Sequence, residues 1–199
     1  FLIALLPGVG DFDDPASWIL PIFGNRENGG SGPIPGRNIV NFSPVPARQF
    51  LAAWAGGFNV CRDAMDEPRR KRLTAALLFL AYVHADDDYM PVVPMLGGHP
   101  NFLADVKSAL AVVAFLFPDH PMASTWADHW QKSFELNTRY NIRPSVKAWD
   151  SHGGRWTENL GTYVWAFLKP TLRSAFLLRQ YDGVERLPFP QIVQLANWL

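Results

Sequence analysis

The sequence predicts an all-α protein built from antiparallel pairs of helices. Six segments after residue 45 repeat apolar residues at the spacing of one helix face, and proline or glycine separates most of them. None of these segments shows the alternation of apolar and polar residues that is typical of a half-buried strand. Helices of this kind bury their apolar stripes against one another, so paired helices joined by loops are the expected architecture.

The chain divides into a loop-rich segment, residues 1–45, and a helical domain, residues 46–199. The first part holds the run GNRENGGSGPIPGRN, in which turn-forming residues cluster without a helical or alternating pattern. A loop of that length is either functional or a connector, and both interpretations stay open. Because the chain begins without Met inside an apolar run and ends on LANWL within a helical pattern, we expect it to be part of a longer protein.

The first expected helix precedes the stretch DEPRRKR, and the second begins within it. The first begins near Pro46, a residue that suits a first helical position, and carries Phe50, Trp54 and Phe58 on one face. The second begins at Glu67 and is apolar nearly all round through LTAALLFLAYVHA, so we expect it to be buried on most sides. The stretch that follows, DDDYMPVVPMLGGHPN, is predicted to be a loop because of its prolines and glycines.

Four further helices are expected in the second half of the chain. The third covers about residues 101–117 and stops before a proline, and the fourth covers about residues 122–141. The fifth covers about residues 158–180 and contains Pro170, which we expect to kink or split it. The sixth begins at QIVQLANWL.

Composition and charge exclude several classes of protein. A hydrophobic content of 48% is typical of a globular chain. Since 18 basic residues balance 18 acidic ones, no long-range electrostatic field favours the binding of nucleic acid. The single cysteine rules out an intrachain disulfide within this stretch and zinc motifs built on several cysteines. The apolar start FLIALLPGVG is too short to span a bilayer. Three consecutive acids, residues 86–88, are interpreted as a solvated loop, so no metal site is predicted.

One stretch, DSHGGRWTENLGTY, is a glycine-rich loop that contains many polar residues and is followed by an apolar helix. Gly153 and Gly154 allow positive φ or close approach to a ligand, and Glu158 and Asn159 are expected in the first turn of the helix. The plain alternative is a turn between helices whose first-turn Glu is favoured by the helix dipole.

Two segments together resemble a known family. GGHPNFLADVKSALAVVAFLFPDHP, followed by a helix that contains Trp, and then GGRWTENLGTYVW are similar to segments of the heparinase II/III-like polysaccharide lyases. The resemblance covers roughly residues 46–199 and implies an incomplete (α/α) toroid. In it Asn101 matches the Asn of the family, and Tyr163, after Trp156 and Glu158 in the same order and spacing, matches its Tyr.

The resemblance implies cleavage of a glycan that contains uronic acid by β-elimination. Asn101 would hydrogen-bond the uronate carboxyl group, and His99 would add positive charge. Tyr163 would act as general acid and base, made a better base by a cation such as Arg155. The competing interpretations are that Asn101 only caps a helix and that Tyr163 belongs to the core.

The remaining residues of the two motifs are candidates for substrate binding, namely Glu158, Trp156, His152 and Asn159. The resemblance further implies an anionic polysaccharide as partner, no cofactor, and a periplasmic or extracellular location. A structural metal in a further domain of a longer protein stays open.

Two alternative functions are also consistent with the sequence. A glycoside hydrolase on a similar toroid would need two carboxylates on either side of the bond, for which Asp88 and Asp150 are candidates. A non-catalytic module would hold a sugar chain in a groove lined by Trp and Phe.

Overall fold

The computed structural model describes residues 55–87, 90–143, 153–187 and 189–199. Helices make up 76% of these residues, so the prediction of an all-α fold is confirmed. The chain forms two compact units, Phe1–Pro91 and Val92–Leu199, which are described one at a time. The predicted loop-rich segment, residues 1–45, and the predicted helix start at Pro46 lie outside the described residues.

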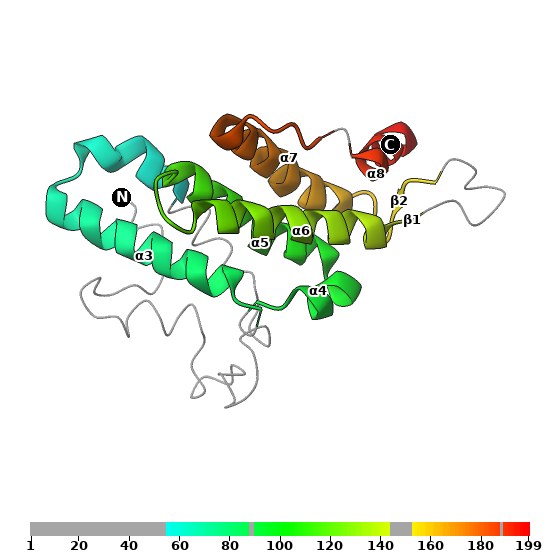
Figure 1. The fold of residues 1–199 in the computed structure, drawn as a ribbon. Helices are drawn as coiled ribbons and strands as arrows, with labels where there is room; N and C mark the ends of the chain where they lie inside the picture. Colours follow the sequence, from blue (N-terminus) through cyan, green and yellow to red (C-terminus); the bar gives the residue numbers. More distant parts are fainter. Residues whose placement is uncertain (1–54, 88–89, 144–152, 188) are drawn as a thin grey trace, which may run out of the picture. The chain divides into compact units, whose positions relative to one another are not determined.

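The described part of the first unit is helical. Residues 55–61 form a helix that continues into the 3-10 helix η4, Arg62–Ala64, and α3 covers Glu67–Ala85 (Figure 1). The side chain of Asp66 accepts a hydrogen bond from the backbone N–H of Arg69 at 2.9 Å, which caps α3 where the sequence predicted its start. Most of the apolar part of this helix is buried or half-buried, as expected, and one side that includes Phe79 and Tyr82, 41% and 47% exposed, is not.

The described residues of the second unit form five helices and a pair of very short strands. The helices are α4 Val92–Gly98, α5 Pro100–Leu116, α6 Ala123–Asn141, α7 Tyr163–Asp182 and α8 Pro190–Trp198. The strands β1, Ile142–Arg143, and β2, Arg155–Trp156, pair in antiparallel fashion, with Ile142 opposite Trp156 and Arg143 opposite Arg155. Helices α5 and α6 begin and end close to the predicted positions, and α8 begins close to its predicted start.

Helix α5 is the centre of the second unit and packs against both α6 and α7. Its apolar residues cover more than one face, so Leu103, Val106, Leu110 and Val113 are all fully buried. Helix α6 runs antiparallel to α5, whereas α7 runs parallel to it (Figure 1). Consequently α5 and α7 begin at the same end of this unit.

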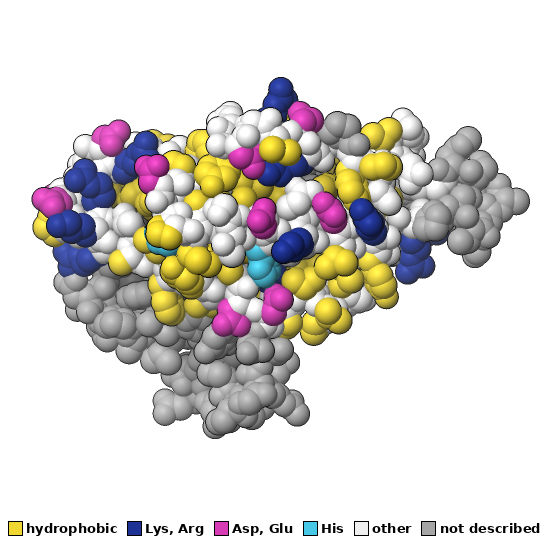
Figure 2. Space-filling model, in the orientation of Figure 1, with side chains coloured by type: hydrophobic (Ala, Val, Ile, Leu, Met, Phe, Trp, Pro, Cys, Tyr) yellow, Lys and Arg dark blue, Asp and Glu magenta, His cyan; other side chains and the backbone are white. Residues whose placement is uncertain are grey.

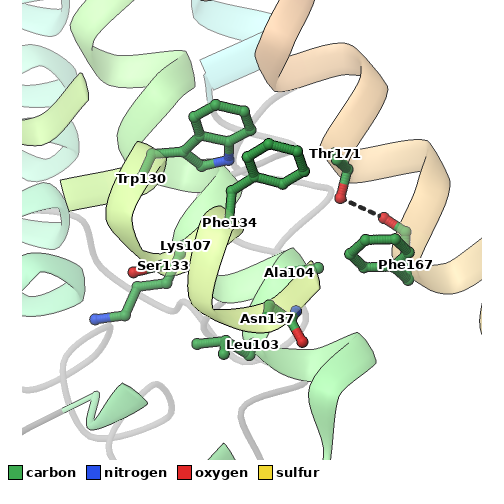
Figure 3. A pocket seen from close by; sticks show the side chains of 9 residues that line it. All are labelled: Leu103, Ala104, Lys107, Trp130, Ser133, Phe134, Asn137, Phe167 and Thr171. Atoms are coloured by element: carbon green, nitrogen blue, oxygen red, sulfur yellow. Dashed lines mark hydrogen bonds between the residues drawn. The ribbon is translucent and has the colours of Figure 1, made fainter. Parts of the chain in front are cut away.

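A small cavity lies where these three helices meet. Trp130 and Phe134 stack on each other on α6, with ring centroids 5.2 Å apart, and face Phe167 and Thr171 on α7 (Figure 3). The cavity measures about 10 Å³, which is close to the space of a single water molecule. A sugar ring is too large for this cavity.

Three predictions about the elements need correction. The predicted loop before residue 100 contains the helix α4, which tolerates Pro94 because the proline lies in its first turn, where no intrahelical N–H is required. The strands β1 and β2 were not predicted, because two residues are too few for an alternating pattern. Helix α7 begins at Tyr163 instead of near Glu158.

Pro170 does not split α7, which continues to Asp182 and ends on Gly183 with φ of 75°. Proline removes one backbone donor from the helix, and the Thr171 hydroxyl adds a hydrogen bond of 2.7 Å to the Phe167 carbonyl one residue further on. The glycine takes the left-handed conformation that commonly ends a helix.

Candidate functional site

A network of buried amides holds together the segments in which the candidate residues lie. The Asn141 side-chain N–H donates to the Leu96 carbonyl at 3.0 Å and to the Asn137 side-chain oxygen at 2.9 Å. Asn137 in turn donates to the Pro100 carbonyl at 2.9 Å. The Thr157 hydroxyl donates to the Asn141 side-chain oxygen at 2.9 Å. The end of α4, the start of α5 and the segment after β2 are therefore held against α6.

Sequence reasoning missed these asparagines, although a signal was present. Asn137 and Asn141 continue the stripe of Trp130 and Phe134 along α6, at intervals of three and four residues. Amides on an apolar helix face are buried with that face and need hydrogen-bond partners there. Asn137 and Asn141 are 1% and 3% exposed, in agreement with this rule.

Asn141→Ala is expected to destabilise the protein by about 2 to 3 kcal/mol, because it removes the donor to the Asn137 side-chain oxygen and the acceptor of the Thr157 hydroxyl. The measurement is urea unfolding followed by circular dichroism. Asn159→Ala is the matched control, since Asn159 is exposed and lies outside the network. Equal loss of stability in the two variants would contradict the role of the network.

Gly153 and Gly154 lead into β2 with positive φ of 65° and 85°, as the sequence suggested for this loop. The Gly154 N–H donates to the Arg143 carbonyl at 2.9 Å. A Cβ atom on Gly154 would come within 2.4 Å of the Gln194 carbonyl oxygen in α8. The close approach is thus to the backbone of α8, and it fixes the strand that leads to Glu158.

Glu158 places its carboxylate at the start of α5. The indole N–H of Trp156 donates to this carboxylate at 3.2 Å, and the backbone N–H of Asn101 donates to it as well. Burial raises the pKa of the Glu158 carboxyl group, while these two hydrogen bonds and the nearby His99 oppose the rise. Glu158 therefore joins the two motifs that are far apart in the sequence.

The raised pKa of Glu158 predicts a specific pH dependence of stability. The folded state keeps the Glu158 proton to higher pH than the unfolded state, so this group lowers stability as the pH rises above about 4.3. Glu158→Gln abolishes the titration. The unfolding free energy of the variant relative to the parent protein is expected to improve between about pH 4 and about pH 7, measured by urea unfolding at both values. A difference that stays constant or changes in the opposite direction would refute the raised pKa.

Trp156 has a different role from the substrate contact that was expected. It is 0% exposed, and its ring stacks on Phe167 with centroids 4.3 Å apart. A fully buried indole offers no surface to a sugar ring, so Trp156 serves to pack β2 against α7 and to orient Glu158.

Asn101 is not the N-cap of α5. His99 occupies the cap position and Pro100 follows it, so Asn101 lies in the first turn with its side chain 3% exposed. The Asn101 side-chain oxygen is buried and has no hydrogen-bond partner among the described residues. Such a group is costly to leave unpaired, which singles out Asn101 as a residue that requires an explanation.

His99 is exposed at the same helix start. Its ring stacks on Phe102 with centroids 5.2 Å apart, and its charge acts on Glu158. Three candidate residues from the two motifs, His99, Asn101 and Glu158, are consequently neighbours at the N-terminal end of α5.

Tyr163 is the first residue of α7 and is 43% exposed, so the interpretation as a core tyrosine is wrong. Its backbone N–H bonds to the Asn159 carbonyl at 2.9 Å. The Asn159 side-chain oxygen accepts from the Thr162 N–H at 3.2 Å. Asn159 thereby shapes the turn that presents Tyr163 at the end of the unit where α5 also begins.

Of the other candidate residues, the structure describes only some. Arg155 lies in β2 and is exposed. His152, proposed for substrate binding, and the two carboxylates considered for a hydrolase, Asp88 and Asp150, lie outside the described residues.

Charge and hydropathy of the described residues add two findings. Basic and acidic side chains lie interspersed on the face drawn in Figure 2, so this face carries no field of one sign. In the part of the chain that the structure describes, no helix is long and apolar enough to cross a membrane, and no group of three or more His, Cys, Asp or Glu residues is arranged to hold a metal ion.

Comparisons of the chain with protein-family models, with curated proteins and with solved structures gave no match. The chain is therefore defined by its own fold and site. It is a helical protein in which a histidine, a buried asparagine and a half-buried glutamate lie together at the N-terminal end of its central helix.

Proposed function

We propose that the chain is part of a polysaccharide lyase that cleaves uronate-containing glycans by β-elimination. The observation that carries this proposal is the proximity of His99, Asn101 and Glu158, contributed by two separate motifs. An exposed tyrosine begins the helix that follows the second motif.

The roles of Asn101 and His99 follow from the chemistry of elimination. The C5 proton of a uronate is too weakly acidic to be removed while the neighbouring carboxylate keeps its full charge. The side-chain oxygen of Asn101 is a buried acceptor with no partner among the described residues, so in this proposal the start of α5 opens to admit the substrate, and the oxygen then favours the protonated form of a carboxyl group placed against it. His99 in its charged form favours the negative charge that develops.

Tyr163 carries the proton in this proposal. Its phenolate removes the C5 proton, the C5 electron pair forms the double bond to C4, and the bond from C4 to the glycosidic oxygen breaks. The resulting phenol then protonates the leaving oxygen, so the tyrosine is regenerated. Exposure of the Tyr163 side chain leaves it accessible to a polymer in solution. No redox cofactor enters these steps.

We further propose that residues 46–199 are part of an (α/α) toroid. In such a toroid, successive helices of one layer run parallel and the helices between them run antiparallel. The parallel pair α5 and α7, connected through the antiparallel α6, has this arrangement (Figure 1). A polymer-degrading enzyme of this kind acts outside the cytoplasm, so a periplasmic or extracellular location belongs to the same proposal.

The test is to incubate the full-length protein with several uronate polysaccharides and to follow two signals. The ultraviolet absorbance of unsaturated uronate reports elimination, and new reducing ends report cleavage by either route. Absorbance that rises with the reducing ends supports the lyase. Reducing ends without absorbance would replace it with a hydrolase, and binding without either signal would replace it with a non-catalytic carbohydrate-binding module.

A further inference from the structure

The outer face of α7 combines aromatic and cationic side chains in one stripe. Trp165 and Phe176 are 50% and 51% exposed, and Lys169 and Arg173 are exposed between them. The spacing of these four residues places them on one side of the helix, over a length of about 16 Å at the helical rise of 1.5 Å per residue. We call these four residues the α7 stripe.

The α7 stripe carries two positive charges and, among the described residues, no ion pair that offsets them. Neither Lys169 nor Arg173 forms an ion pair with another described residue, whereas Arg179 further along is paired with Glu185 at 2.9 Å. No acidic residue occurs in the sequence of α7 before Asp182. In a chain whose total charge is zero, this face is a local concentration of positive charge.

The combination fits an anionic polysaccharide better than an apolar partner. A helix packed against this face would bury Lys169 and Arg173 without counter-charges on α7, which is costly. A polymer that carries carboxylates supplies those charges, and its sugar rings can lie on the faces of Trp165 and Phe176. The stripe begins at the same end of α7 as Tyr163, but residues two positions apart in a helix point in different directions, so the stripe and Tyr163 lie on different sides of α7.

We propose that the α7 stripe is a binding track for the anionic polysaccharide, distinct from the cluster of His99, Asn101 and Glu158. The inference rests on the proposed function for the identity of the polymer. The track increases the affinity for long chains, and the cluster at the start of α5 acts on the sugar unit that reaches it.

The test measures binding of the full-length protein to polygalacturonate and to alginate, with neutral dextran as the comparison polymer. The protein carries Tyr163→Phe so that the polymers stay intact. Replacing Lys169 and Arg173 together by Ala is expected to weaken binding of both polyuronates about tenfold and to reduce its dependence on salt. Trp165→Ala is expected to weaken binding of the same polymers about fivefold.

The matched control replaces Arg70 and Lys132, two exposed residues on α3 and α6, by Ala. It removes the same total charge and is expected to change affinity by less than about twofold. Unchanged affinity of the α7 variants for the polyuronates, or an equal loss of affinity in the control variant, would contradict the proposal of a binding track. Dissociation of an oligomer by the α7 variants in sedimentation, with polymer binding unchanged, would overturn it in favour of a protein partner.

The outcome is separable from that of the lyase assay. If polymer binding depends on the α7 stripe but the protein gives no elimination product, the result supports the binding track and contradicts the lyase. If the protein has elimination activity but its polymer binding does not depend on the stripe, the result supports the lyase and contradicts the track.

Discussion

Tyr163→Phe is expected to lower the elimination rate at saturating substrate by about 100-fold or more, because the variant lacks the hydroxyl group that exchanges protons with C5 and with the leaving oxygen. Tyr163 is 43% exposed at the first position of α7, so removal of the hydroxyl leaves the packing of the helix unchanged. The measurement is the initial rate of ultraviolet absorbance increase on a uronate polysaccharide, at several substrate concentrations.

The expected pattern is a loss in kcat with little change in KM, since a phenyl ring makes the same stacking contacts with the substrate as a phenol. Tyr140→Phe, at an exposed tyrosine on α6, is the control and is expected to keep the parent rate. Full activity of Tyr163→Phe would remove Tyr163 from the mechanism. Equal losses in both variants would point to a general effect on the protein.

The sequence predicted most helices because their apolar residues follow one period and their ends carry familiar signals. Asp66 and Pro68 mark the start of α3, and Gly183 marks the end of α7. Helix α4 was missed because its proline and glycines are typical of loops, and only its position in the first turn makes Pro94 compatible with a helix.

The candidate site was predictable in its members but less so in their roles. Residues His99, Asn101 and Glu158 were named from two loops, and the structure brings these three together. Trp156 was expected to contact substrate because an aromatic side chain in a polar loop is typical of sites where a sugar ring stacks on the aromatic ring. Its burial depends on stacking with Phe167, a contact that no local pattern encodes.

The start of α7 shows why local reasoning placed Glu158 wrongly within the helix. A glutamate before an apolar helix is typical of a first turn, where the dipole favours it. In the structure it occupies the start of a different helix, α5, because β2 and the Asn141 network hold the loop there. Glu158 does lie at a helix N-terminus, as expected, but the helix is α5 and not α7, which follows Glu158 in the sequence.

Gly154→Ala is expected to destabilise the protein by about 3 to 5 kcal/mol, the largest effect on stability among the substitutions considered. Two costs add. A residue with a Cβ atom is strained at φ of 85°, and the new Cβ would lie 2.4 Å from the Gln194 carbonyl oxygen. Because the atom it meets belongs to the backbone of α8, no side-chain rotation relieves the overlap, and β2 or α8 has to move.

A shift of β2 also moves the groups that depend on it, so the effect of Gly154→Ala is expected to reach the candidate site. Urea unfolding gives the stability, and the pH dependence attributed to Glu158 is expected to weaken as its carboxylate leaves the start of α5. Gly97→Ala is the matched control, because a Cβ at Gly97 meets nothing within 4 Å. The control is expected to be neutral or slightly stabilising, since alanine is favoured over glycine in a helix. A stability of Gly154→Ala close to that of Gly97→Ala would mean that β2 does not pack on α8, and the geometry that brings Glu158 to Asn101 would then be wrong.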